Sequence, residues 1–368
     1  MKKKGSFDYI LFISVILLVL IGITMVFSSS YYYSMVKWND KYYFFRRNTI
    51  MCIIGFIAMM SSTFIFRIKM YKRLSGVILL GSIVLLALVL TPLGTTYNNS
   101  TRWLKFMGYT FMPSEVAKLG MICFISASVS NNTKKLKNLI SGLGPYLVVT
   151  GIVCGLILLE PDMSTSVTIA GIVFAILYVA GMRYSHLALF GILGSGLLYV
   201  LINSSDYRYA RWISFMDPFK YKLTFGWQII QSLYAFGAGG LFGVGLGQST
   251  QNKLYISEPQ NDFILATIGE EFGFIGTLFV MMLFFIVIWR GIKIAMDSED
   301  MFSTLMATGI TAQIAIQVII NVGVATSALP VTGIPLPFIS YGGTATIITM
   351  FSMGILLNIS RNNHKELN

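Results

Sequence analysis

Long uninterrupted apolar blocks constrain this sequence more than any other feature. The first, FDYILFISVILLVLIGITMVFSS, contains about 20 apolar residues, enough for one helix to cross the hydrocarbon core of a bilayer. The blocks show neither the alternation of a half-buried strand nor the narrow stripe of a surface helix. Since 55% of the 368 residues are hydrophobic and only 11% are charged, we predict an all-α polytopic membrane protein. The first block lacks a small-residue cleavage site, which predicts a retained helix rather than a signal peptide.

Ten transmembrane helices, with both termini in the cytoplasm, are predicted. Lys and Arg are concentrated in short segments on the face that carries both termini, which predicts an N-in/C-in orientation. The net charge of +12 then reports this topology and contact with anionic lipids, not nucleic-acid binding. We treat residues 1–368 as a single membrane domain. With a window of about 19 residues, the spans lie near residues 7–29, 48–66, 75–93, 112–130, 143–159, 163–181, 186–203, 263–289, 302–326 and 341–360.

The residue types that most often carry metal or redox chemistry are scarce and scattered. Cys52, Cys123 and Cys154 all fall inside apolar blocks, so no disulfide framework or thiolate metal site follows from them. Neither His186 nor His364 has a nearby ligand partner, and no HExxH motif or Walker loop occurs. Zinc chemistry and ATP-driven transport are therefore unsupported, and no metal-ligating residues are predicted.

The segment 204–262 is the one long connection, between the seventh and eighth spans, and we predict a large extracellular loop there. Loops of this length are uncommon unless they are functional. Within it, QIIQSLYAFGAGGLFG is predicted to form a short amphipathic or re-entrant helix, whose terminal glycines let backbones approach closely. The run GAGGLFGVGLG has a GxGxxG-like spacing, but no strand precedes it, so packing glycines are a better interpretation than a dinucleotide site.

Two opposite charges lie inside the fourth predicted span. Glu115 and Lys118, in MPSEVAKLG, are three residues apart and about 60° apart around a helix, so they can pair. A charge at the centre of a span costs about 2.5–3.5 kcal/mol on insertion scales, which makes it a functional candidate. Two interpretations stay open: an ion pair that holds the bundle together, or a polar cavity wall whose lysine meets an anion.

Four acids gather where the eighth span begins, in SEPQNDFILATIGEEFGFIG. Asp262 precedes the apolar run, where it is either a helix N-cap or a functional carboxylate at the outer edge of the membrane. Glu270 lies about 80° from Asp262 around the helix and can share a cavity with it, whereas Glu271 faces away and is expected to bond a neighbouring span. Both glutamates are predicted to be mainly structural. Glu258 is expected to lie in a loop that shapes the site.

Two further outer segments line up with this face. TTYNNSTRWLKFMGYTFMPSE joins Arg102 and Trp103 to the segment of Glu115, although an interfacial Trp is usually a membrane anchor. ALPVTGIPLPFISYGG contains prolines and glycines that break helical hydrogen bonding beside Ser340 and Tyr341. Non-helical backbone at membrane depth survives only when it is buried in protein or lines a cavity. Together these segments predict a site that opens outward.

Taken together, these segments resemble the SEDS family of shape, elongation, division and sporulation proteins, the FtsW, RodA and SpoVE group, and look closest to its FtsW and SpoVE branch. The family's essential aspartate lies in the motif TDFIFA, which is NDFILA here and points to Asp262, and its functional loop tryptophan falls on Trp103. The sequence departs from the family pattern at Asn261, Leu265 and Thr344, and in EPDMS where QPDLG is common, which puts substrate contacts in question more than activity. The resemblance covers nearly the whole chain, with these motifs in family order: NNSTRWL, PSEVAK, EPDMSTS, YRYARWISFMDPF, GWQIIQSLYAFGAGGLFGVGLGQS, SEPQNDFILATIGEEFGFIG and NVGVATSALPVTGIPLPFISYGGT.

This resemblance implies a peptidoglycan glycosyltransferase that polymerises lipid II into glycan strands at the outer face of the bacterial cytoplasmic membrane, for cell division or cell shape. The implied partners are lipid II, the growing lipid-linked strand, a class B penicillin-binding protein and other divisome or elongasome membrane proteins, and the division septum is one expected location. An α-linked donor and a β-linked product fit a single inverting displacement with Asp262 as general base. Arginine suits the leaving diphosphate through its planar fork. The residues expected to bind substrate are Arg102, Trp103, Glu115, Lys118, Arg208, Arg211, Gln228, Gln231, Ser232, Glu258 and Ser340.

One cofactor and two rival functions complete these expectations. A divalent cation, Mg²⁺ or Mn²⁺, could assist at the diphosphate, although no ligand set is readable in the sequence. The first rival is a lipid II flippase or transporter, because intramembrane charges and broken helices also mark transport pathways. The concentration of polar groups on the outer half argues against it. The second rival is a non-catalytic scaffold of a cell-wall synthase complex.

Overall fold

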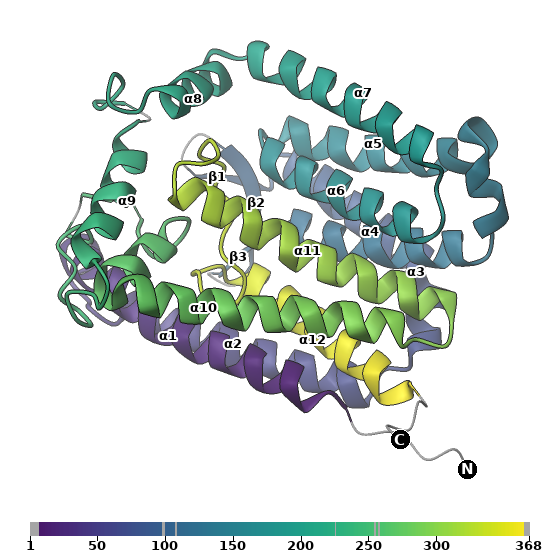
Figure 1. Cartoon of the computed structure of the whole chain (residues 1–368), viewed down its shortest axis with the longest axis horizontal. Coiled ribbons are helices and arrows are strands. Elements are labelled where there is room, and N and C mark those ends of the chain that lie inside the picture. Colours follow the sequence, from purple (N-terminus) through teal and green to yellow (C-terminus); the bar gives the residue numbers. More distant parts are fainter. Residues whose placement is uncertain are drawn as a thin grey trace.

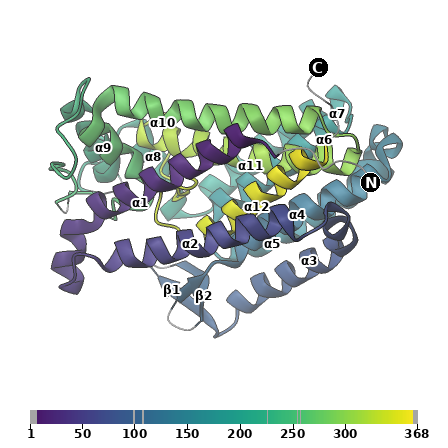
Figure 2. The same cartoon turned by 90° about the horizontal axis from the view of Figure 1, so that it is seen from below.

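The structure is a computed structural model that describes residues 7–97, 100–106, 109–224, 226–253, 255–256 and 258–363, without the side chains of residues 97, 106 and 109. His364 lies outside the described residues, as do Lys2, Lys3, Lys4 and Lys365 among the terminal basic residues that favoured the cytoplasmic orientation. Most of the described chain is helical, and the long helices run side by side as one bundle (Figure 1; Figure 2). The helices are α1 Tyr9–Trp38, α2 Tyr43–Phe64, α3 Ile68–Val89, α4 Pro113–Ser130, α5 Gly144–Leu159, α6 Met163–Val179, α7 Tyr184–Asn203, α8 Asp206–Met216, α9 Gly226–Gly239, α10 Ile264–Met296, α11 Met301–Ala325 and α12 Thr344–Asn362, with short helices η1 Thr133–Lys137 and η2 Leu139–Leu143 before α5.

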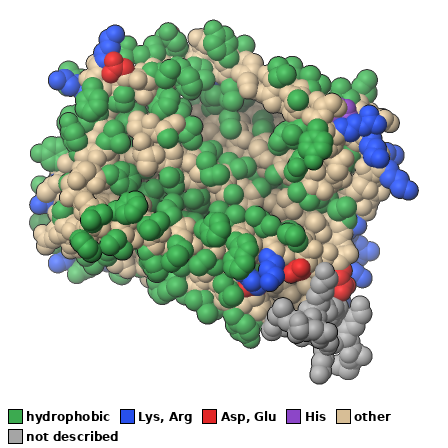
Figure 3. Space-filling view, in the orientation of Figure 1, with side chains coloured by type: hydrophobic (Ala, Val, Ile, Leu, Met, Phe, Trp, Pro, Cys, Tyr) green, Lys and Arg blue, Asp and Glu red, His purple; other side chains and the backbone are tan. Residues whose placement is uncertain are grey.

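Each predicted span coincides with one of the long helices. In the described part of the chain, eight helical segments are long and apolar enough to cross a membrane, and α6 is a shorter apolar helix. The space-filling view, in the orientation of Figure 1, shows apolar side chains over much of the visible face. Lys and Arg gather mainly toward the margins of that face (Figure 3). This pattern is that of a multi-pass membrane protein, because a bilayer covers the apolar band and water solvates the charged ends.

A small antiparallel sheet corrects the all-α prediction. The strands β1 Gly94–Tyr97, β2 Ser100–Phe106 and β3 Tyr109–Phe111 pair in the order β1-β2-β3 between α3 and α4. STRWLKF does not alternate strictly between polar and apolar residues, so the period of a half-buried strand is not readable in it, and the sequence predicted only a loop. The sheet holds Arg102 and Trp103 on one strand, so both residues have a fixed backbone position.

The long loop contains two helices between α7 and α10. The predicted short helix in QIIQSLYAFGAGGLFG is confirmed as α9, whereas α8 was not predicted. In Figure 1, α7 and α8 form an arch that continues into α9 at one end of the bundle. No residue of α7 is buried, although its mean hydropathy is that of a membrane span, so this helix packs loosely against the rest of the molecule.

A backbone break at Gly273 divides α10 into an N-terminal and a C-terminal part. Gly273 has φ 66° and ψ −164°, outside the helical region, and the freed backbone pairs with the glycine-rich segment after α9. The amides of residues 244 and 245 donate to the carbonyls of residues 270 and 271, and the amides of residues 274 and 275 donate to those of residues 240 and 241. A Cβ atom at Gly239 would lie 1.9 Å from the carbonyl oxygen of Gly269, so only glycine permits this approach. The interpretation of GAGGLFGVGLG as packing glycines agrees with these contacts.

Candidate functional site

Asp262 lies at the N-terminal end of α10, one residue before the helix cap. The N-cap is Phe263 and no side chain caps this helix, so the N-cap interpretation of Asp262 is wrong. Its main-chain carbonyl accepts a hydrogen bond from Nδ2 of Asn321 on α11, at 2.9 Å. A Cβ atom at Gly333 would lie 3.6 Å from Oδ2 of Asp262, so the loop after α11 runs close to the carboxylate. Asp262 therefore lies between α11 and the loop that follows it, and its carboxyl group does not cap α10.

The charge environment of Asp262 brings together residues from distant parts of the chain. Burial raises the pKa of its carboxyl from 3.8 to about 6, and the negative charges of Glu258 and Asp162 act in the same direction. Arg211 and Arg102 oppose the rise. A carboxyl group with a pKa near 6 is mostly ionised at neutral pH and still accepts a proton readily, which is the property of a general base.

Arg211 on α8 reaches toward the same loop. Its Nη1 donates to the carbonyl oxygen of Val331 at 3.2 Å, and its guanidinium lies 4.6 Å from the ring centre of Tyr207. Burial lowers the pKa of Arg211, while Tyr207 and Asp262 raise it. Because an arginine keeps its charge even when buried, this side chain brings a fixed positive charge to the Asp262 carboxylate.

Arg102 on β2 binds the turn between α5 and α6. Its Nε donates to the carbonyl oxygen of Glu160 at 3.3 Å, its Nη2 donates to the carbonyl oxygen of Pro161, and its Nη1 lies 3.8 Å from Oδ2 of Asp162. The Asp162 side chain also caps α6, accepting from the amide and hydroxyl of Thr165. Arg102 thus binds this turn and adds positive charge near Asp262. Most of its guanidinium donors are already engaged by the turn.

Carbonyl groups of the loop after α11 are bound by side chains from three other elements. Ser164 at the start of α6 donates to Thr332, Arg211 donates to Val331, and Asn321 donates to Ile334. This non-helical segment is therefore bound by protein groups, as expected for irregular backbone in a membrane protein. The loop forms one wall of the site beside Asp262.

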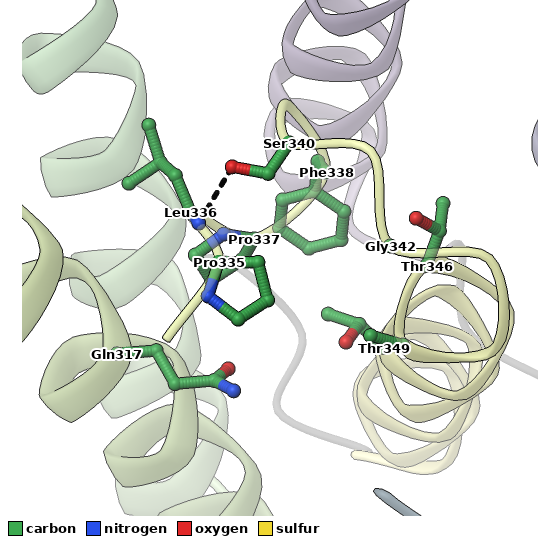
Figure 4. A pocket seen from close by; sticks show the side chains of 10 residues that line it. Gln317, Pro335, Leu336, Pro337, Phe338, Ser340, Gly342, Thr346 and Thr349 are labelled. Atoms are coloured by element: carbon green, nitrogen blue, oxygen red, sulfur yellow. Dashed lines mark hydrogen bonds between the residues drawn. The ribbon is translucent and has the colours of Figure 1, made fainter. Parts of the chain in front are cut away.

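Ser340 supports the same loop through a local hydrogen bond. Its Oγ accepts from the amide of Leu336 at 2.9 Å, next to a cavity of about 10 Å³ (Figure 4). The Gln317 side chain lines this cavity, and its Oε1 has no hydrogen-bond partner among the described residues. The volume and the polar lining suit one water molecule rather than a sugar. Residues lining the cavity include Gln317, Pro335, Pro337, Ser340, Thr346 and Thr349.

The predicted ion pair on α4 is confirmed. Lys118 Nζ donates to Oε1 of Glu115 at 2.7 Å, and both side chains are almost fully buried. The second oxygen of Glu115, Oε2, has no hydrogen-bond partner among the described residues. An ion pair buried this deeply costs desolvation energy, so it is weak evidence for a purely stabilising role.

The two adjacent glutamates of α10 have different partners. Glu271 accepts from the hydroxyl of Ser28 on α1 at 2.6 Å, which confirms that it bonds a neighbouring span. Glu270 accepts from the hydroxyl of Ser249 and from the amide and hydroxyl of Thr250. Glu270 therefore binds the loop after α9. These contacts do not support the prediction that Glu270 shares a cavity with Asp262.

The other predicted substrate residues are distributed around α9, α8 and the sheet. Ser232 is buried and donates to the carbonyl of Ala325, which ties α9 to α11, and Gln231 is buried beside it. Arg208 donates to the carbonyl oxygen of Leu201 near the end of α7, away from the charges that act on Asp262. Gln228 on α9 and Trp103 on β2, opposite Thr95, are half-buried, and the Glu258 side chain accepts from Asn261.

Two residues of the Asp262 surroundings were missed by sequence reasoning. Asp162 was not predicted for the site and appeared only within the EPDMS motif, although the order Asp-x-Ser-Thr before an apolar run is an N-cap signal that places a carboxylate at a helix end. Asn321 is a polar residue within a predicted span, which is itself a signal for a functional or architectural hydrogen bond. No group of three or more His, Cys, Asp and Glu residues in the described part of the chain is arranged to hold a metal ion.

Comparison with known proteins gives consistent matches over nearly the full length. A family model described as "Cell cycle protein", for FtsW, RodA and SpoVE, matches residues 8–365. Stage V sporulation protein E of Bacillus subtilis (strain 168) is 40% identical over 362 residues, covering 98% of both chains. The probable peptidoglycan glycosyltransferase FtsW of Trichlorobacter lovleyi is 38% identical over 365 residues, covering 97% of this chain and 94% of its own. A chain of a solved peptidoglycan synthase complex has the same fold, with a TM-score of 0.81, 24% identity, and 98% and 99% coverage of the two chains.

Proposed function

Because this chain belongs to the FtsW, RodA and SpoVE family of cell cycle proteins, we propose that it is a peptidoglycan glycosyltransferase. Its substrate is lipid II, which it polymerises into glycan strands at the outer face of the bacterial cytoplasmic membrane, for cell division or cell shape. The observation that carries this proposal is the Asp262 carboxylate, held at the outer end of a membrane helix with a pKa of about 6 and flanked by Arg211 and Arg102.

Asp262 serves as the general base in this mechanism. The acceptor sugar hydroxyl attacks the anomeric carbon of the donor, a new glycosidic C–O bond forms, and the bond to the lipid diphosphate breaks. Asp262 takes the hydroxyl proton, and the electron pair of the broken bond leaves with the diphosphate. Because the single displacement inverts the anomeric centre, no covalent sugar intermediate on a second carboxylate is needed.

Positive charge for the leaving diphosphate comes first from Arg211. Its guanidinium belongs to the charge environment of Asp262, and arginine binds phosphate oxygens through its planar fork. Arg102 contributes mainly through its electric field, since its donors already bind the α5–α6 turn. Lys118, Arg208, Trp103, Glu258 and the polar residues of α9 remain proposed substrate contacts.

A divalent cation, Mg²⁺ or Mn²⁺, remains part of the proposal only as a companion of the substrate. The described residues contain no cluster of three His, Cys, Asp or Glu groups that would form a protein-built metal site. The cation would therefore bind mainly to diphosphate oxygens. Titrating a chelator during polymerisation tests this role: activity that is lost with chelator and restored by Mg²⁺ or Mn²⁺ supports it, and unchanged activity contradicts it.

Ten membrane spans with both termini in the cytoplasm are proposed for a single membrane domain. This arrangement adds α4 and α6 to the eight clearly apolar segments and puts Asp262 on the outer side. A solved complex related in fold is described as coordinating polymerization and crosslinking, which supports a class B penicillin-binding protein as partner. Other divisome or elongasome proteins, and a location at the septum, belong to the same proposal.

Polymerisation of lipid II by the purified protein tests the function. The full-length chain is combined with its partner transpeptidase, and glycan strands are separated by gel electrophoresis. We expect polymer with the wild-type chain and with a catalytically inactive partner, and none with Asp262→Ala. Glu299→Ala, at an exposed position far along the chain from the site, is the matched control and should polymerise normally. Absence of polymer under every partnered condition would contradict the enzyme.

The same samples distinguish the two rival functions. Movement of labelled lipid II across liposome membranes that requires Asp262, without polymer, would favour the flippase. Polymer that disappears with an inactive partner but persists in Asp262→Ala would favour a scaffold that activates another enzyme. Both rivals must account for the acidic and basic groups gathered at the Asp262 end of the bundle.

A further inference from the structure

Glu160 is a fully buried carboxyl group that the proposed mechanism does not use. It lies at the end of α5, its side chain has no exposed surface, and neither carboxylate oxygen has a hydrogen-bond partner among the described residues. Its main-chain carbonyl, by contrast, accepts from Nε of Arg102. A carboxylate that is buried without hydrogen bonds is unfavourable, so the neutral acid is the form that this place accommodates.

The charged groups that act on Glu160 come from two neighbouring elements. They are Asp162 at the cap of α6 and Arg102 on β2. The helices α3 and α4 also contact α5, and the two charged side chains of α4, Glu115 and Lys118, neutralise each other as an ion pair. Burial, followed by the charge of Asp162, raises the pKa of Glu160 to about 8, while Arg102 lowers it. Since the pKa is raised, the group is neutral below pH 8 and gains its charge as the pH rises through that value.

We propose that Glu160 is a positioning residue that works as a neutral carboxylic acid, and that its ionisation weakens the binding of a lipid diphosphate at the Asp262 site. With Glu160 neutral, the charges of Arg102 and Asp162 cancel. With Glu160 ionised, the same group of three carries one negative charge. The extra negative charge repels an anionic ligand. It also offsets part of the positive potential that Arg102 produces at Asp262. This inference rests on the proposed function, because it takes a lipid diphosphate as the ligand.

The test measures binding of farnesyl diphosphate to the purified full-length protein between pH 7 and pH 9.5. Two neutral variants, Glu160→Gln and Glu160→Leu, are compared with the wild type, and Glu299→Gln is the matched control. The wild type and the control are expected to lose affinity several-fold as the pH rises through 8. Both Glu160 variants are expected to bind at pH 7 as the wild type does and to keep that affinity at pH 9.5. A structural role alone would change affinity at every pH.

Each other outcome counts against a stated part of the proposal. If the Glu160 variants lose affinity at high pH as the wild type does, or if the wild type shows no such loss, the role of Glu160 is wrong while the proposed function stands. If neither variant folds, the neutral role is also wrong, because a neutral group without hydrogen bonds should be replaceable by an amide or by leucine. If the wild type binds no farnesyl diphosphate at any pH, both the inference and the diphosphate chemistry of the proposed function are contradicted.

Discussion

Asp262 shows how position along a helix separates residues of the same charge. It lies before the cap of α10, where burial and neighbouring acids raise its pKa to about 6. Glu270 and Glu271 lie two turns further along the helix. Glu270 accepts hydrogen bonds from the loop after α9, and Glu271 accepts one from α1. Of these three acids, only Asp262 combines a raised pKa with a carboxyl group that makes no hydrogen bond in the described contacts.

Replacing Asp262 by asparagine should abolish most activity without lowering stability. A general base contributes about 10²–10⁴-fold to the rate, so polymerisation should fall by that factor. The pKa is above its ordinary value of 3.8, so ionisation costs folding stability as the pH rises through 3.8 to 6, and the cost persists above pH 6. Asp262→Asn should therefore keep or raise the Tm at pH 7.5. A lowered Tm would show that the carboxylate is structural.

The wild-type pH profile checks the same assignment. Polymerisation should decline about tenfold per pH unit below pH 6, where the Asp262 carboxyl group becomes protonated and can no longer accept a proton. The measurement is the initial rate of polymer formation at lipid II concentrations well below saturation, which reports the pKa of the free protein, corrected for stability at each pH. A rate that stays constant down to pH 5 would contradict a base with this pKa.

Two interpretations of the buried Glu115–Lys118 pair on α4 remain: a structural ion pair, or the polar wall of a cavity. Glu115 and Lys118 form an ion pair, but Oε2 of Glu115 keeps an unused acceptor among the described residues. A cycle of Lys118→Met, Glu115→Leu and the double variant separates the interpretations. Each single variant leaves one buried charge unpaired and should cost about 3–5 kcal/mol, whereas the double variant should fold with nearly wild-type Tm. Full activity in the double variant supports the purely structural pair, and lost activity supports the cavity wall.

At the scale of elements, the broken α10 and the glycine segment after α9 form one unit. Their backbones exchange hydrogen bonds on both sides of Gly273, and Glu270 binds residues 249 and 250 of the same loop. The part of α10 before Gly273 begins two residues after Asp262. The position of Asp262 therefore depends on the packing of α9 and its glycines.

A methyl group at Gly239 should disturb this unit. The new Cβ would lie 1.9 Å from the carbonyl oxygen of Gly269, so one backbone must move, at a cost of about 1–3 kcal/mol. We expect Gly239→Ala to lower the Tm in detergent and to reduce polymerisation. Gly151→Ala on α5, where no atom lies within 4 Å of the new Cβ, is the control and should keep or raise the Tm. Equal Tm values for the two variants would contradict the close packing.

At the scale of the whole molecule, orientation decides whether Asp262 can meet an extracellular sugar. Cysteine substitutions at two exposed residues test it: Glu299→Cys between α10 and α11, and Phe219→Cys between α8 and α9. A membrane-impermeant thiol reagent applied to intact cells should label only Phe219→Cys, and permeabilised cells should show both. The unsubstituted chain controls for Cys154, which is half-buried. The opposite labelling pattern would invert the topology and remove the proposed function.

The sequence by itself determined the helices of the predicted spans and α9, the long connection between α7 and α10, the Glu115–Lys118 pair and the different directions of Glu270 and Glu271. These features depend on residue spacing along one helix or on runs of apolar residues, both of which are local. The small sheet was missed because its strands are short and gain their stability from pairing. Only the tertiary structure decided that Arg102 binds the turn of Glu160 and Asp162, that Ser164, Arg211 and Asn321 bind one loop, and that the Glu160 side chain is buried with no hydrogen-bond partner among the described residues. Those contacts join residues up to 168 positions apart, and burial at such meeting points sets their protonation and charge.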